Sequence, residues 1–148
     1  MEWSDAMAVA LEEARAALAH DDVPVGAVVV RDGEVIARRH NERELTGDPT
    51  AHAEVLALRD AAAALGSWRL QECALVVTLE PCPMCAGAAL AARIPTIVFG
   101  AADAKAGAAG TLYNLAADPR LPHEATVTAG VCANEAAALL RSFFDQRR

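Results

Sequence analysis

Apolar residues recur along the first forty positions at two spacings, and these spacings predict a helix followed by a hairpin. Residues 4–19 follow the helical repeat and predict an amphipathic helix. The apolar positions of that repeat are Met7, Leu11, Ala14 and Leu18. The apolar, largely β-branched run at 25–31 predicts a strand, and residues 34–40 predict its partner. Asp32-Gly33 between them indicates a tight turn, because glycine tolerates the positive φ that hairpin turns require.

The rest of the chain continues this alternation. Predicted helices span 50–65, 83–93 and 134–147, and predicted strands span 74–79, 96–99 and 126–128. We expect Thr50 to cap the first of these helices. The apolar side of the last helix is predicted to comprise Leu139, Leu140, Phe143 and Phe144. The order of elements predicts a three-layer α/β/α domain over residues 1–148, with a central mixed sheet of about five strands.

Composition and charge narrow the kind of protein. The chain has 148 residues, 54% of them hydrophobic and 22% charged, which is typical of one globular domain rather than a disordered segment. No apolar run reaches the roughly 18 residues of a membrane span, and the acidic start does not resemble a signal peptide. We therefore expect a cytoplasmic protein with no membrane partner. The net charge of -7 argues mildly against a nucleic-acid partner, because phosphate binding needs a basic surface.

Two short fragments carry the candidate chemistry, and each begins a predicted helix. One is His52-Ala53-Glu54, and the other places Cys82 and Cys85 on one face of a first helical turn. Backbone N–H groups and the helix dipole at that position favour thiolates. Two thiolates and an imidazole suit Zn²⁺, and three protein ligands leave a fourth position for water, as catalytic sites do. We predict one Zn²⁺ per chain, held by His52, Cys82 and Cys85.

Other interpretations of these cysteines stay open at this point. A Cys-x-x-Cys by itself is also found in redox pairs. A closed structural zinc would need a fourth donor, and Cys73 is a poor one because the strand 74–79 separates it from Cys82 by roughly 20 Å. Cys132 is permitted by its spacing, although nothing near it resembles half of a zinc motif. A zinc-stabilised binding module without turnover is a further alternative, against which the presence of Glu54 argues.

Glu54 requires a separate argument. Residues two apart on an ideal helix point about 200° away from each other, so His52 and Glu54 reach one site only if it lies beyond the helix end. A glutamate in a first turn is also explained by the helix dipole alone. Beside a three-ligand zinc, we expect Glu54 to act as the proton carrier.

The paired fragments resemble the His-x-Glu and Pro-Cys-x-x-Cys signature of the cytidine and deoxycytidylate deaminase superfamily. Longer stretches of the chain are similar to one branch of that superfamily, the bacterial tRNA-specific adenosine deaminases. These stretches are residues 23–28, 41–54, 78–88, 93–94, 99–101, 103–105, 107–110 and 142–144. The resemblance therefore covers nearly the whole chain and implies the cytidine deaminase-like fold.

The resemblance implies a homodimer that converts adenosine to inosine at the wobble position of tRNA anticodons. It places the zinc ligands on His52, Cys82 and Cys85, and the proton shuttle on Glu54. Zinc would lower the pKa of a bound water, so that hydroxide attacks C6 of the base. The residues implied to contact the substrate are Asn41 at the base, Asp103 and Lys105 near the anticodon loop, and Phe143, Phe144 and Arg147 at a helix end approaching the RNA.

Two positions depart from the family pattern. Ala102 stands where the family often has arginine, and Asp145 with Gln146 interrupts a tail that tends to be basic. Both departures remove positive charge from the expected RNA path. The alternative function is therefore a zinc-dependent deaminase of free nucleobases or nucleosides, of guanine, cytosine or adenine type. The acidic net charge favours that alternative slightly, and the similarity at 103–110 and 143–144 disfavours it.

Overall fold

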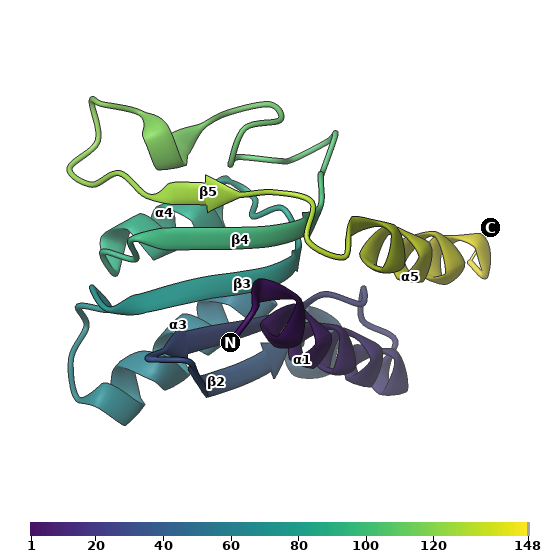
Figure 1. Cartoon of the computed structure of the whole chain (residues 1–148). Coiled ribbons are helices and arrows are strands. Elements are labelled where there is room, and N and C mark those ends of the chain that lie inside the picture. The colour runs from purple at the N-terminus through teal and green to yellow at the C-terminus, as the bar shows by residue number, and fades with distance from the viewer. Residues whose placement is uncertain (148) are drawn as a thin grey trace.

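The computed structural model describes residues 1–147, which fold around one five-stranded sheet (Figure 1). The strands lie in the order β2-β1-β3-β4-β5. Their bounds are β1 Gly26–Arg31, β2 Glu34–His40, β3 Cys73–Leu79, β4 Thr96–Ala101 and β5 Thr126–Thr128. β1 is antiparallel to β2 and β3, whereas β3, β4 and β5 run parallel to one another. The sheet is therefore mixed, as predicted.

Helices cover both faces of this sheet. They are α1 Trp3–Ala16, α2 Arg43–Thr46, α3 Ala53–Leu65, α4 Pro83–Ala91 and α5 Ala133–Asp145, with 3₁₀ turns η1 Ala17–His20 and η2 Leu115–Ala117. α1 and α5 pack on one face, and α3 and α4 pack on the other (Figure 1). The predicted three-layer α/β/α architecture is thereby confirmed. Within residues 1–147, no helix combines the length and apolar character needed to cross a membrane.

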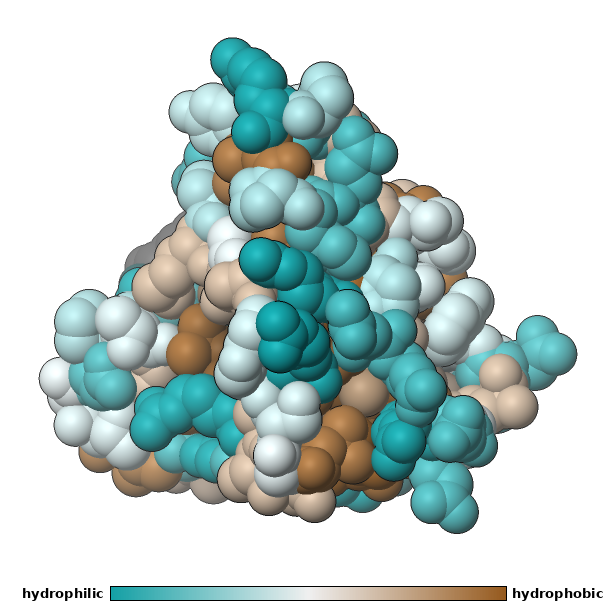
Figure 2. All heavy atoms as spheres, turned by 90° about the vertical axis from the view of Figure 1, so that its left-hand side faces the viewer, coloured by the Kyte–Doolittle hydropathy of each residue, from teal (hydrophilic) through white to brown (hydrophobic). Residues whose placement is uncertain are grey.

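Alternate residues of each central strand fill a different core. In β1, Ala27 and Val29 face α3 and α4, whereas Val28 and Val30 face α1. Burial of one such side chain contributes about 1.5–3 kcal/mol. Because both faces are covered, these strands read in the sequence as continuous apolar runs rather than as alternating patterns. Figure 2 shows the end of the molecule where β3 and β4 begin, and its surface is mostly hydrophilic with apolar side chains in separate small areas.

Glycines fix two local features of the first layers. A Cβ on Gly26 would lie 1.9 Å from the carbonyl oxygen of Ala10, so a glycine is needed where α1 crosses the start of β1. In the hairpin turn, Asp32 and Gly33 have φ values of 51° and 76°. Both residues therefore adopt the left-handed conformation that the Asp-Gly pair predicts.

Several element boundaries differ from the prediction. Thr50 does not cap α3, because its N–H and hydroxyl both bond to Asp48 in a preceding turn, and His52 is the N-cap instead. β4 continues through Gly100 to Ala101. In α5, Phe143 is buried but Phe144 is 46% exposed, and Leu139 and Leu140 are half-buried. The reason is that α5 projects beyond the sheet, so only part of its length packs on β3 and β4 (Figure 1).

Candidate active site and metal centre

Two helix N-termini on the same face of the sheet bring the predicted zinc ligands together. His52 is the N-cap of α3 and has an extended backbone. Cys82 is the N-cap of α4, immediately before Pro83, and Cys85 is the third residue of that helix. Because α3 and α4 pack against each other, their first turns open toward one point near the end of β3.

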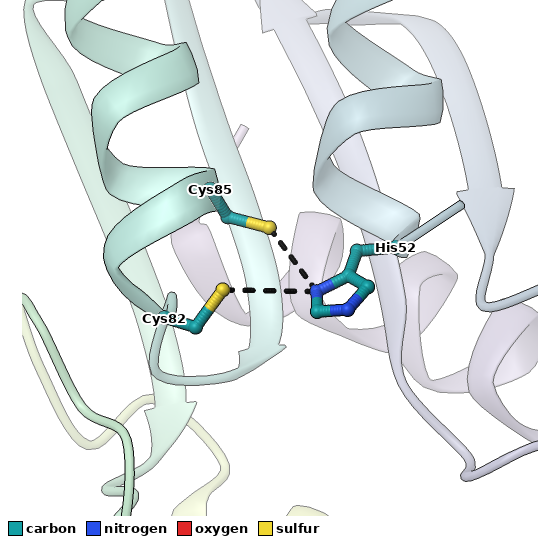
Figure 3. Close-up of side chains that lie close together, drawn as sticks. All are labelled: His52, Cys82 and Cys85. Atoms are coloured by element: carbon teal, nitrogen blue, oxygen red, sulfur yellow. Dashed lines mark hydrogen bonds between the residues drawn. The ribbon is translucent and has the colours of Figure 1, made fainter. Parts of the chain in front are cut away.

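The three side chains converge with distances that suit one metal ion (Figure 3). The Nδ1 atom of His52 lies 3.7 Å from the sulfur of Cys82 and 3.4 Å from the sulfur of Cys85. A nitrogen and a sulfur bound to one tetrahedral Zn²⁺ are about 3.6 Å apart, so the donor set fits zinc. In the described part of the chain, neither Cys73 nor Cys132 belongs to this group. The closed structural zinc therefore lacks its fourth donor there.

The two cysteines differ in charge when no metal is bound. Cys85 donates to the sulfur of Cys82, and with the help of His52 this lowers the pKa of Cys82 to about 4. The same hydrogen bond, together with burial, raises the pKa of Cys85. The metal-free pair therefore holds one thiolate and one thiol. Zinc requires both sulfurs as thiolates, so metal binding would release a proton.

Glu54 lies beside the ligands, in the first turn of α3. Its side chain is 4% exposed and lines the same pocket as His52 and Cys82. Burial raises the pKa of Glu54 to about 7, against the opposing effect of His52. A carboxyl group with a pKa near neutrality can both accept and donate a proton. The pocket lies off the helix end, which is the position that the spacing of His52 and Glu54 required.

Asn41 and Asp103 line the same pocket, which has a volume of about 180 Å³. The Asn41 amide donates to the carbonyl of Val23 at 3.2 Å and accepts from the N–H of Arg43 at 3.0 Å. These two bonds fix the side chain in place. A primary amide has two N–H groups and two acceptor lone pairs, so Asn41 retains capacity for a ligand.

The other residues implied to contact substrate line two adjoining hollows. Lys105 and Phe144 share one hollow with Asp103, and Phe143 and Arg147 line the other. Val23 lines both hollows and the pocket, so the three form a continuous surface. Arg147 already has partners within the chain, because it is ion-paired with Asp21 and its guanidinium lies 3.5 Å above the Phe143 ring.

Comparison with known proteins finds similarity to deaminases along the chain. The family model of MafB19-like deaminases matches residues 1–148. The tRNA-specific adenosine deaminase of Bacillus subtilis is 49% identical over 142 residues, which cover 96% of this chain and 88% of that protein. The enzyme of the same name from Streptococcus pyogenes is 44% identical, with coverage of 96% and 89%. This chain belongs to the tRNA-specific adenosine deaminase family.

Solved structures confirm the fold class of this chain. One comes from a study of A-to-I editing by tRNA:A34 deaminases at the wobble position of transfer RNA. Its TM-score is 0.89, at 45% identity over 92% of this chain and 99% of that one. A guanine deaminase from Nitrosomonas europaea has a TM-score of 0.81, at 29% identity over 95% of this chain and 83% of that one. The resemblance predicted from the sequence motifs is confirmed.

Glu80 is a residue of the deaminase site that sequence reasoning missed. Its side chain is 2% exposed, and its oxygens accept from the N–H groups of Asp103 at 3.0 Å, Ala109 at 3.0 Å and Thr111 at 3.1 Å. The Thr111 hydroxyl donates to it as well. Burial opposes ionisation, yet these hydrogen bonds hold the pKa of Glu80 below its usual value. The sequence feature that could have identified Glu80 is an acidic residue directly after an apolar strand.

The loop from Asp103 to Thr111 therefore wraps around one carboxylate. A Cβ on Gly107 would lie 2.5 Å from the Glu80 carboxyl carbon, so a glycine is required at that contact. Because Asp103 lines the pocket, Glu80 holds one of the pocket walls in place. The Glu80 side chain also lines the pocket itself.

Replacing Glu80 with glutamine is expected to loosen the loop, because the new amide N–H group would face backbone N–H donors. A buried donor left unpaired costs about 1–3 kcal/mol. We expect faster amide hydrogen exchange at Ala109 and Thr111 and a several-fold higher KM, with zinc content unchanged. Glu72→Gln is the matched control, because Glu72 is exposed and its ion pair with Arg31 lies on the surface. Unchanged exchange in Glu80→Gln would show that the carboxylate does not organise the loop.

Proposed function

We propose that this deaminase converts adenosine to inosine at the wobble position of tRNA anticodons by hydrolysis. The observation that carries the proposal is the convergence of His52, Cys82 and Cys85 beside buried Glu54, in a pocket that Asn41 also lines. The similarity to proteins named tRNA-specific adenosine deaminase supports the choice of substrate.

The proposed mechanism assigns a role to each side chain in the pocket. His52, Cys82 and Cys85 would hold one Zn²⁺ per chain, and the ion when bound would supply Lewis-acid activation of a water molecule for attack at C6 of adenine. Glu54 accepts a proton from that water and delivers it to the ring nitrogen beside C6. Glu54 then takes the proton of the new hydroxyl group on C6 and passes it to the amino group, so that the C6 carbonyl forms and ammonia leaves. Asn41 orients the base by hydrogen bonds.

The apolar wall of the pocket limits access of bulk water to these steps. Val25 and Leu79 line it together with Val23. Exclusion of water strengthens electrostatic interactions between the base and the polar side chains. The same exclusion of water raises the pKa of Glu54, because burial is the main cause of that shift.

The adjoining hollows give the RNA a path away from the pocket. Bases of an anticodon loop are already unpaired, so moving the target base into the pocket costs little. Phe144 is 46% exposed and offers an aromatic face on which a neighbouring base can stack. We propose that Lys105 and Arg147 contact the phosphates of the RNA. Arg147 would leave its ion pair with Asp21 to make this contact.

Substrate assays separate this proposal from its rival. Guanine deaminase relatives and the net charge of -7 favour activity on free bases. We expect the enzyme to convert an anticodon stem-loop that carries a wobble adenosine, and to leave free adenosine, guanine and cytosine unchanged. A stem-loop with guanosine at the wobble position is the control. Conversion of free bases alone would contradict the tRNA proposal.

We also propose that the enzyme is a homodimer in the cytoplasm, as the family resemblance implies. A shallow apolar hollow between α3 and α4 supports the dimer, because its lining includes exposed Trp68 and Ala91. Sedimentation analysis should give twice the chain mass, and Ala91→Arg should shift it to the monomer. Ala138→Arg on α5 is the control. A monomeric wild type would contradict the proposed dimer. Cell fractionation tests the proposed cytoplasmic location.

A further inference from the structure

Two histidines outside the pocket face each other across two elements. His20 ends η1, and His40 ends β2. Their Nε2 atoms lie 3.1 Å apart. Their side chains are 17% and 21% exposed, so the pair is sheltered but reachable from solvent. The proposed deamination mechanism uses neither residue.

A carboxylate holds the outer nitrogen of each ring. The Nδ1 atom of His20 lies 2.7 Å from Asp22, and the Nδ1 atom of His40 lies 2.9 Å from Glu13. Burial opposes ionisation of both acids. Even so, hydrogen bonds keep the pKa of each carboxyl below its usual value. Asp22 accepts from two backbone N–H groups of α2 and from His20, and Glu13 accepts from His40 and Arg38. Both groups are therefore carboxylates, which only accept hydrogen bonds, so each Nδ1 carries the hydrogen.

This arrangement leaves two lone pairs directed at each other. A neutral imidazole with its hydrogen on Nδ1 has an acceptor lone pair on Nε2. Two such acceptors at 3.1 Å repel each other unless a proton or a metal ion lies between them. The surroundings also favour a cation, because Glu12, Glu13 and Asp22 outnumber Arg38, the one cation bonded to this cluster in residues 1–147.

The distances match those of two ligands on one metal ion. Two nitrogens each about 2.0–2.1 Å from an ion are about 2.9–3.4 Å apart in octahedral to tetrahedral geometry. Metal-binding histidines also characteristically donate their other ring N–H to a carboxylate, which fixes the tautomer and the ring orientation. His20 and His40 both show this outer arrangement.

We propose that His20 and His40 form a second metal site, which binds Zn²⁺ or another divalent ion that prefers imidazole, with water completing the coordination. The hollow beside His20, lined also by Asp22 and Arg43, has a volume of about 510 Å³ and gives room for those waters. The ion would join η1 to β2. Because Asp22 accepts from the N–H groups of Glu44 and Leu45, the ion would also steady α2, which carries the pocket residue Arg43.

Metal stoichiometry tests the site without reference to activity. The full chain is dialysed against Zn²⁺, and bound zinc is measured by mass spectrometry. The expected result is that His20→Gln and His40→Gln each bind one equivalent fewer than the wild type. His123→Gln is the matched control, because His123 bonds to the carbonyl of Ile94 at another place in the fold, and it should bind as much as the wild type.

Three results would overturn the proposal. One is an equal zinc stoichiometry in the wild type and in both variants, a second is a loss of zinc equally large in His123→Gln, and the third is a proton detected by NMR on an Nε2 of the pair at saturating Zn²⁺. The last result would mean that the histidines share a proton instead of a metal. Circular dichroism checks that each variant is folded, and His20→Gln, on a short surface turn, keeps the test available if His40→Gln unfolds.

Discussion

Glu54→Gln is expected to lower kcat about 10²–10⁴-fold while leaving zinc bound, which is the range that a positioned acid–base group contributes. Glutamine has nearly the same shape and fills the same buried position, but it does not exchange protons at neutral pH. The proton transfers to the ring nitrogen and to the leaving amino group would both lose their carrier. Steady-state kinetics on the anticodon stem-loop and metal analysis of the same sample measure the two effects.

Glu135→Gln provides a control of the same chemistry for this prediction. Glu135 is also an acidic residue in the first turn of a helix, but it is exposed and pairs with Arg15. Its replacement should leave kcat within about twofold of the wild type, because exposed ion pairs contribute little. Near-normal turnover in Glu54→Gln would show that another group moves the protons.

Cys85→Ala is expected to abolish both zinc binding and activity. The variant removes one of the two thiolates from the set of three donors, and Zn²⁺ should be held much more weakly by His52 and Cys82 alone. Bound zinc should decrease from about one equivalent at this site to nearly none after dialysis against a mild chelator. Zinc bound by the His20–His40 pair is excluded from this measurement by making Cys85→Ala in the His20→Gln variant and measuring bound zinc again.

Cys132→Ala serves as the matched cysteine control. Cys132 is half-buried at the N-cap of α5 and does not belong to the ligand group. It should retain full zinc content and turnover. If Cys85→Ala kept its metal and activity, the assignment of the centre to these three side chains would be wrong.

The sequence predicted most of the sheet because local and tertiary preferences coincide there. The hairpin has the predicted bounds of β2, since Asp32-Gly33 fixes the turn and β-branched residues flank it. At Thr50 a local rule failed, because Asp48 takes its hydroxyl and N–H. The four-residue helix α2 was not predicted, since its support includes long-range hydrogen bonds from its backbone to Asp22.

In the candidate site, too, residues with local sequence signals were predictable, whereas contacts between distant parts of the chain were not. His52, Cys82 and Cys85 were predictable because each occupies the first turn of a helix that strong signals begin. The role of Glu80 was not predictable, because its four hydrogen bonds come from three residues that lie 23 to 31 positions away, in a loop without a clear sequence pattern. The ion pair of Arg147 with Asp21 joins opposite ends of the chain, and no spacing rule foresees it.

The anchoring of the loop on Glu80 has a consequence for how this scaffold can be modified. Glu80 stands two residues before Cys82, a proposed metal ligand, and three of its four hydrogen bonds come from backbone N–H groups. The side chains at Ala104, Lys105 and Ala106 take no part in that anchor. They are therefore positions at which a library of substitutions can retune substrate preference, while Gly107, Thr111 and the metal ligands are kept constant.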